Sequence, residues 1–226
     1  MAESYVTSPN FDQNKPNTRL KQIYLIRHGE TDYNKNKIVQ GSGVDAALNA
    51  TGLQQADQFF EAYQHISFEE VYISQLQRTY QTVRRFIEEK NIPYQAFAGL
   101  NEISWGTREG MPFHPDEHRY YLDTIAAWQR GSIDLAIEGG ESPRQVAERQ
   151  KPIIARLKES SAKKLLVCMH GRAMRILLTQ LLGYPLSYMD IFEHRNLTLY
   201  QLTYTGAFFQ VNLFNDVNHL QVNEAP

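Results

Sequence analysis

Five residues whose side chains could carry chemistry stand at, or shortly after, the ends of apolar runs in the sequence. They are two arginines, two histidines and one glutamate: Arg27, His28, Arg78, Glu102 and His170. Arginine stays charged at any working pH, and its planar fork of donors fits the oxygens of a phosphoryl group. A neutral imidazole is a good nucleophile toward phosphorus, and a carboxylic acid can protonate a leaving alkoxide and then deprotonate water. These residue types therefore indicate phosphoryl transfer, which depends mainly on positioning and electrostatic stabilisation.

Short apolar runs predict the strands that would hold these residues. Four runs occupy residues 23–26, 71–73, 94–97 and 164–169, and two later ones, 197–204 and 207–213, meet at Thr205-Gly206. The segments between them predict helices, so the pattern is that of an α/β fold. We expect a three-layer sandwich with a mostly parallel central sheet flanked by helices and a late antiparallel hairpin at the edge. Because ligands of such sheets bind beyond the carboxyl ends of the strands, the five residues should converge on one rim.

Capping patterns predict where several helices begin. Three pairs follow the spacing of a capping box: Thr51 with Gln54, Ser74 with Gln77, and Ser142 with Gln145. The helix after Ser74 should run to about residue 90, and residues 174–182 predict a core helix because they are apolar nearly all round. Residues 102–138 are less regular. Gly29 and Gly171 follow the two histidines, where we expect them to let the backbone approach a phosphate closely.

The composition is that of a globular protein with one sizeable domain. The chain has 226 residues and a net charge of -2, so no basic field favours a nucleic-acid partner. No run approaches the ~20 apolar residues of a membrane helix, and the single Cys168, in an apolar run, excludes an internal disulfide and predicts a buried thiol. We expect a polar lead-in at residues 1–21, a single domain at 22–226 with a substrate-covering insertion at 103–140, and a cytoplasmic location.

A resemblance to a known family narrows this interpretation. The motifs that carry it are residues 23–31 (Ile-Tyr-Leu-Ile-Arg-His-Gly-Glu-Thr), 48–56, the spaced residues from Ser74 to Thr82, Leu100-Asn101-Glu102 followed by Glu109-Gly110, residues 139–142, and Met169-His170-Gly171. In this order they resemble the blocks of the histidine phosphatase superfamily, the phosphoglycerate mutase-like family. The resemblance covers about residues 22–215.

The resemblance implies a role for each matching residue. His28 would be the nucleophile that becomes phosphorylated, and Glu102 would donate a proton to the leaving group. The phosphoryl group would be held by the remaining residues: Arg27, Asn34, Arg78, His170 and Gly171. The family needs no metal, and we expect no cofactor. Two departures stand out, since Arg108 and Arg172 occupy positions where the family often has Trp and Gly.

Simpler interpretations remain open for several residues. Glu109 and Glu30 are rival carboxylates for the role given to Glu102, and Asn34 could be a turn former. Ser74 could be only a helix cap. The aromatic residues between Trp105 and Trp128 could form core or the wall of a substrate site.

The implied activity is hydrolysis of a small phosphate monoester through a phosphohistidine. A cofactor-dependent phosphoglycerate mutase would use the same core residues, but the short segment 107–138 favours the phosphatase because mutase chemistry requires closure against water. A non-enzymatic module that binds phosphate is the third hypothesis. The sequence leaves the substrate and the oligomeric state open.

Overall fold

The computed structural model describes residues 20–112 and 115–220, and within the helix that starts at residue 115 it describes the side chains from residue 119 onward. Six strands form one sheet in the order β3-β2-β4-β1-β5-β6. Their bounds are β1 (Lys21–Arg27), β2 (Glu70–Ile73), β3 (Tyr94–Ala96), β4 (Lys164–Met169), β5 (Leu199–Tyr204) and β6 (Phe209–Asp216). The first four strands run parallel to one another, whereas β5 pairs antiparallel with β1 on one side and with β6 on the other. The predicted α/β sandwich with a late hairpin at the edge is confirmed.

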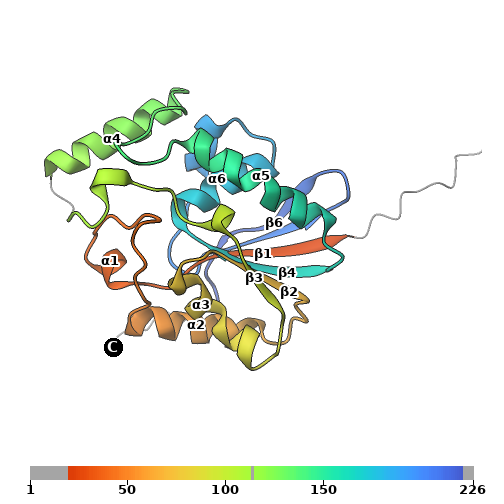
Figure 1. The fold of residues 1–226 in the computed structure, drawn as a ribbon. Helices are drawn as coiled ribbons and strands as arrows, with labels where there is room; N and C mark the ends of the chain where they lie inside the picture. Colours follow the sequence, from red (N-terminus) through yellow and green to blue (C-terminus); the bar gives the residue numbers. More distant parts are fainter. Residues whose placement is uncertain (1–19, 113–114, 221–226) are drawn as a thin grey trace, which may run out of the picture.

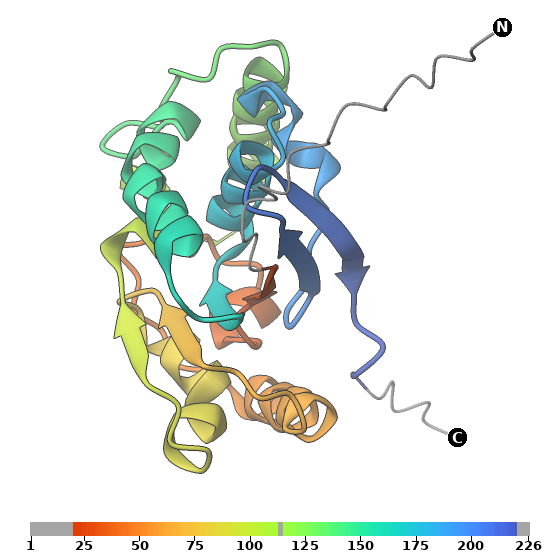
Figure 2. The same ribbon diagram turned by 90° about the vertical axis from the view of Figure 1, so that its right-hand side faces the viewer.

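Helices cover both faces of this sheet (Figures 1 and 2). On one face lie α2 (Ala50–Tyr63) and α3 (Gln77–Glu88), and on the other α5 (Pro143–Glu159) and α6 (Gly171–Leu181). The alternation of side chains along β1 explains the two layers, because successive residues of a strand point to opposite faces. Ile23 and Leu25 join the core beneath α5 and α6, whereas Tyr24 and Ile26 join the core beneath α2 and α3.

The register of the central strands aligns their ends. Arg27, the last residue of β1, pairs with Met169, the last residue of β4. Ile26 pairs with Leu199, the first residue of the antiparallel strand β5. The carboxyl ends of β1 and β4 therefore meet the start of β5 at one rim of the sheet.

Two helix starts differ from the sequence prediction. The cap of α2 is Asn49, whose side chain accepts from Gly52 N at 2.9 Å, and Thr51 lies inside the first turn. Residue Leu76 precedes α3 without a side-chain cap, and Ser74 uses its hydroxyl elsewhere. The sequence pattern of a cap does not show which side chain is used: Asn49 caps α2 in place of Thr51, and the Ser74 hydroxyl contacts His170. The third prediction is confirmed, since Ser142 and Gln145 form a capping box with Pro143 at the start of α5.

The segment between β3 and α5 contains a helix that the sequence did not predict. α4 (Pro115–Gln129) lies beside the short 3₁₀ turn Leu186–Ile191, at the top of the view in Figure 1. Its apolar residues are spread among charged ones, so periodicity is weak, yet Trp128 is fully buried. The smaller helix α1 (Asp32–Lys35) follows β1 directly.

The two ends of the expected domain can be compared only in part. Residues 1–19 of the predicted lead-in and 221–226 lie outside the described residues. Lys21, which was assigned to the lead-in, instead begins β1, and its Nζ donates to the carbonyls of Leu157 and Lys158 at 3.0 and 2.6 Å. Cys168 is buried as predicted. None of the helices that the structure describes is both long and apolar enough to cross a membrane.

Candidate active site

His28 lies at the end of β1 with one ring nitrogen committed and the other open. Its Nδ1 lies 2.7 Å from the carbonyl oxygen of Gly29, so this nitrogen carries the proton and donates it there. Nε2 has no hydrogen-bond partner among the described residues. Burial, with the nearby charges of Arg78 and Arg27, holds the pKa of His28 well below its usual value. The ring is therefore neutral with a free lone pair on Nε2.

His170, at the end of β4, packs beside His28 with 5.1 Å between the ring centroids. Arg78 Nε donates to its Nδ1 at 3.1 Å, so the ring proton sits on Nε2 and is donated to Ser74 Oγ at 2.8 Å. Burial and the charge of Arg78 keep the pKa of His170 well below its usual value. His170 is therefore a neutral donor. Ser74, expected to be a helix cap, holds this histidine instead.

Two arginines border the histidines, and Arg27 is only partly buried. Arg78 is fully buried, and its terminal nitrogens donate to Val44 O at 2.6 Å and to Gly41 O at 3.3 Å. Burial lowers the pKa of both Arg27 and Arg78 to about 10, so both stay charged at neutral pH. Arg27 Nε is buried and has no partner among the described residues. Each guanidinium thus keeps its charge beside the histidines.

The Glu102 carboxylate lies at the first turn of α6, next to His170. Its Oε1 accepts from Ile103 N at 2.9 Å and from Ala173 N at 2.8 Å, and its Oε2 accepts from Arg172 N at 3.1 Å. Oε1 therefore has both acceptor positions filled, and Oε2 keeps one. Glu102 is therefore almost completely buried, with 7% of its surface exposed.

The rival carboxylates are placed differently. Glu109 Oε1 accepts from Trp105 N at 2.9 Å and from Ser104 Oγ at 3.3 Å. Glu30 Oε1 accepts from Asn49 Nδ2 at 2.9 Å, at the start of α2. Of the three carboxylates, Glu102 is the one bound to the helix that begins beside His170.

Asn34 joins the site and also has the turn role considered from the sequence. Its Oδ1 accepts from Thr31 N as part of the cap of α1, and it accepts from Asn196 Nδ2 at 3.1 Å. The same Asn196 amide donates to His28 O at 3.0 Å. The Asn196 side chain thus forms a hydrogen-bonded bridge between Asn34 and the backbone of His28.

The two glycines are needed for reasons within the protein. A Cβ at Gly29 would lie 2.6 Å from Gly52 O in α2, and one at Gly171 would lie 2.5 Å from the ring of His194. The close approach that these glycines permit is therefore to neighbouring chain segments. The sequence prediction gave the phosphate as the reason.

His194 is a site residue that the sequence reasoning missed. Arg27 Nη1 lies 3.3 Å from its Nδ1, so Nδ1 accepts and Nε2 carries the proton. Burial and the charge of Arg27 lower the pKa of His194 to about 2. It precedes β5, and the rule that directs attention to strand carboxyl ends omits the beginning of an antiparallel strand at the same rim. The signal available in the sequence was the polar run Glu193-His194-Arg195-Asn196 before an apolar strand.

The two positions that depart from the family pattern have defined partners. Arg172 is buried, donates to Asp190 and to the hydroxyl of Tyr121 at 3.2 Å, and lies over the ring of Trp128. Arg175 shares the same Asp190. The Arg172 side chain thus ties α6 to α4. Arg108 lies over the ring of Tyr120, 4.7 Å from its centroid.

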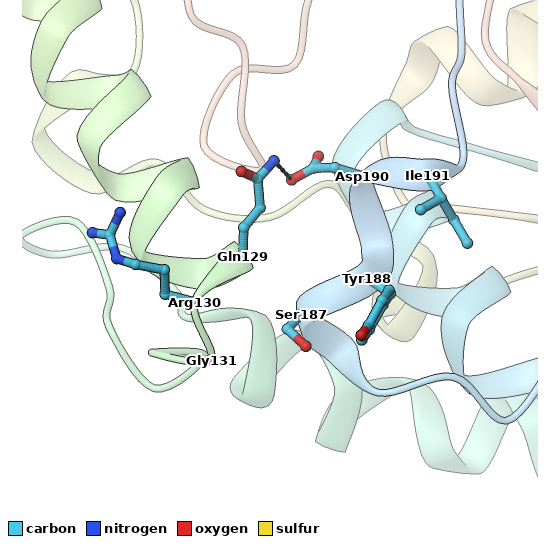
Figure 3. A pocket seen from close by; sticks show the side chains of 7 residues that line it. All are labelled: Gln129, Arg130, Gly131, Ser187, Tyr188, Asp190 and Ile191. Carbon is cyan, nitrogen blue, oxygen red and sulfur yellow. Dashed lines mark hydrogen bonds between the residues drawn. The ribbon is translucent and has the colours of Figure 1, made fainter.

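Two hollows lie on the surface of the described residues, one beside Asn34 and one beside Asp190. A cavity of about 280 Å³ is lined by Asn34, Lys37, Gln40 and several apolar or aromatic side chains. A second, of about 520 Å³, lies between the end of α4 and the 3₁₀ turn and reaches Asp190, which accepts from Gln129 at 3.2 Å (Figure 3). None of the residues predicted for the site lines the second hollow. The described residues contain no group of three side chains suited to hold a metal ion.

Comparison with known proteins agrees with this arrangement. Residues 23–217 match the family description of the histidine phosphatase superfamily (branch 1), and the chain belongs to this superfamily. It is 30% identical over 165 residues to the adenosylcobalamin/α-ribazole phosphatase of Escherichia coli strain K12, covering 73% of this chain and 80% of the relative. It is 29% identical over 211 residues to a protein of Enterobacter sp. strain 638 named "Probable phosphoglycerate mutase GpmB", covering 89% and 95%. The crystal structure of the α-ribazole phosphatase from Shigella flexneri superposes with a TM-score of 0.76 at 26% identity, covering 86% of this chain and 96% of that one.

Proposed function

We propose that the protein hydrolyses a small phosphate monoester in two steps through a phosphohistidine on His28. The observation that carries the proposal is the hydrogen bond from His28 Nδ1 to Gly29 O, because it leaves Nε2 as a neutral nucleophile at the rim. Membership of the superfamily and likeness to named phosphatases support it.

In the first step, His28 Nε2 attacks phosphorus in line with the departing oxygen. A bond forms between Nε2 and phosphorus, and the bond between phosphorus and the ester oxygen breaks. Glu102 gives its proton to that oxygen, and we assign the transfer to Oε2 because this oxygen keeps a free acceptor position. The alcohol then leaves.

In the second step, water replaces the alcohol. Glu102 takes a proton from the water, the water oxygen bonds to phosphorus, and the bond between Nε2 and phosphorus breaks. Inorganic phosphate departs, and Glu102 is again protonated for the next cycle.

In both steps, hydrogen-bond donors at the rim would stabilise the negative charge of the phosphoryl group. The guanidinium groups of Arg27 and Arg78 face negative charge on the phosphoryl oxygens in a site of low dielectric, where such interactions are strong. His170 is proposed to turn its Nε2–H from Ser74 Oγ to a phosphoryl oxygen. Asn34 supplies a further amide donor, and Gly171 binds through its backbone at the start of α6, where partial positive charge accumulates.

A phosphate-release assay tests this function. Purified protein is mixed with an aryl phosphate in excess chelator, beside His28→Ala. We expect release that survives the chelator and is abolished in the variant. Full activity in His28→Ala, or activity removed by the chelator, would contradict the proposed chemistry.

A phosphoglycerate mutase is the second candidate, favoured by the relatives named for that activity. It would return the phosphoryl group from His28 to a second hydroxyl in place of water. An assay with 3-phosphoglycerate and a bisphosphoglycerate primer separates the two, since a mutase forms 2-phosphoglycerate and a phosphatase releases inorganic phosphate.

A further inference from the structure

We propose that Arg149 and Glu141 are positioning residues for the proton donor: together they hold the backbone on both sides of Glu102 and so set where its carboxyl group lies. This role rests on the proposed phosphatase function. It also assigns a purpose to residues 139–142, which belong to the family pattern and supply none of the groups that act in the two proposed steps.

Glu102 lies in a loop that is not itself part of a helix or a strand. The loop connects two short 3₁₀ turns, Ala98–Leu100 and Gly106–Arg108. Backbone N–H groups of Ile103 and of α6 hold the Glu102 carboxylate, but they do not hold the backbone from which the side chain extends. A proton donor must lie within hydrogen-bond distance of the leaving oxygen, and a displacement of about 1 Å can lower the rate by about 10²-fold. The backbone of the loop therefore needs support from another element.

Arg149, in α5, gives this support with its whole guanidinium group. Its Nη2 donates to Glu102 O at 3.0 Å, and its Nη1 donates to Gly99 O at 3.0 Å and to Ala98 O at 3.3 Å. Nε donates to Glu141 Oε1 at 2.7 Å, and Nη2 also donates to Glu141 Oε2 at 3.0 Å. These contacts use all five N–H groups of the side chain. Arg149 therefore keeps no donor for a phosphoryl oxygen, and its contacts hold the loop instead.

Glu141 holds the loop on the other side of Glu102. Its Oε2 accepts from Ser104 N at 2.9 Å, and its own N donates to Ser104 O at 2.9 Å. The ion pair with Arg149 is bidentate, and only 23% of the Arg149 side chain and 25% of the Glu141 side chain are exposed. A bidentate pair has a defined orientation. The pair thus brackets Glu102, because one member binds its carbonyl and the other binds the amide two residues further along.

Helix α5 provides a fixed base for the pair. Glu141 directly precedes Ser142, the cap of α5, and Arg149 lies about two turns into the helix. Ile153, one turn further along, is buried in the core. Because α5 is capped at its start and packed along its length, it can hold the loop in one place. Loss of either member of the pair should displace the carboxyl group of Glu102 and leave the phosphoryl site as it is.

The test compares two esters with rings of similar size, benzyl phosphate and p-nitrophenyl phosphate. The benzyl alkoxide needs a proton as it leaves, and p-nitrophenolate does not. In Glu141→Gln and Arg149→Lys we expect kcat/KM to fall by about 10- to 100-fold on benzyl phosphate and by less than about threefold on p-nitrophenyl phosphate, as for a misplaced proton donor. Lysine keeps the charge but lacks the planar fork of donors, so charge alone should not restore the wild-type ratio. The Ki for inorganic phosphate should stay close to that of the wild type.

Arg144→Lys is the matched control. Arg144 lies in the same helix and forms a bidentate pair with Asp134, but both side chains are exposed and their hydrogen bonds do not involve the loop of Glu102. This variant should leave the ratio of kcat/KM on the two esters unchanged.

Equal losses on the two esters in Glu141→Gln and Arg149→Lys, or no loss on benzyl phosphate, would overturn the inference and leave the phosphatase function intact. Release by the wild type from p-nitrophenyl phosphate alone would mean that no proton donor serves the leaving group, and it would also overturn the inference. Absence of phosphate release from both esters would instead overturn the proposed function.

Discussion

Glu102 and Glu109 show how one residue type acquires different roles from its surroundings. Glu102 is bound to the start of α6 beside His170, whereas Glu109 accepts from Trp105 N and fills the space left by Gly41. We predict that Glu102→Gln lowers kcat/KM on an alkyl phosphate by about 10²- to 10⁴-fold, because the proposed proton donor to the leaving group is lost. The loss in kcat/KM should be much smaller on p-nitrophenyl phosphate, whose leaving group needs no proton, although kcat should fall on both esters because Glu102 also activates water in the second step.

Glu109→Gln is the comparison variant. An amide oxygen still accepts from Trp105 N, so its activity should stay within a few fold of wild type on both esters. The values of kcat/KM on the two substrates check both statements. Equal losses on the two substrates in Glu102→Gln would point to a structural role at the start of α6, and a leaving-group effect in Glu109→Gln would transfer the acid role to that residue.

At the same scale, residue type and spacing predicted part of the set of side chains that meet, but not His194. The structure brings His28, Arg78 and His170 within contact and places Glu102 at the adjacent helix start. The proton positions on His170 and His194 could not be predicted, because they depend on tertiary partners: Ser74 for His170 and Arg27 for His194. Ser74 and His170 are far apart in the sequence, so their hydrogen bond could not be predicted from local patterns.

At the scale of elements, the first turn of α6 and the approach to β5 form one unit. Gly171 has no Cβ, and the ring of His194 occupies that space while its Nδ1 accepts from Arg27. We predict that Gly171→Ala displaces the imidazole and weakens phosphate binding, seen as a roughly tenfold higher Ki for inorganic phosphate, the size of one lost hydrogen bond to a charged group. His194→Ala should have a similar effect.

The double variant makes this prediction specific. If both changes act through the same contact with Arg27, their effects are not additive. Gly171→Ala combined with His194→Ala should then resemble either single variant. Additive losses in Ki would show that the two residues act independently, and unchanged Ki in His194→Ala would remove His194 from the site.

Elements with strong local patterns were predictable, and those stabilised by packing were not. The runs of β1 and β4 are buried on both faces and appear in the sequence as continuous apolar segments. Helix α4 lacks such a pattern because much of its surface is exposed; it is held to the rest by Trp128 and by the Arg172 contact with Tyr121. The segments that contact this helix, α6 and the 3₁₀ turn Leu186–Ile191, lie far from it in the sequence, so a local pattern does not reveal it.

At the scale of the whole molecule, the buried histidines couple stability to pH. The pKa values of His28 and His170 are well below their usual value in the folded state, whereas in the unfolded chain they are about 6.5. Below pH ~6.5 the unfolded chain therefore binds more protons, so the free energy of unfolding decreases as the pH falls, by up to about 1.4 kcal/mol per pH unit for each histidine. Above pH ~6.5 this dependence disappears.

Urea unfolding between pH 7.5 and 4.5 checks this coupling. His170→Asn should show a shallower loss of stability below pH 6.5 than wild type. His65→Gln, at an exposed position, should follow the wild type. Identical slopes in wild type and His170→Asn would contradict the assignment of His170 as a neutral buried donor.

The central claim is that the phosphoryl group passes through His28. The most direct measurement is to mix the protein with ³²P-labelled p-nitrophenyl phosphate, quench in alkali within milliseconds and locate the label by peptide mapping. The account predicts an acid-labile, alkali-stable phosphate on the peptide containing His28, absent in His28→Ala and present in Glu102→Gln. Turnover without any labelled peptide, or label on another residue, would contradict it.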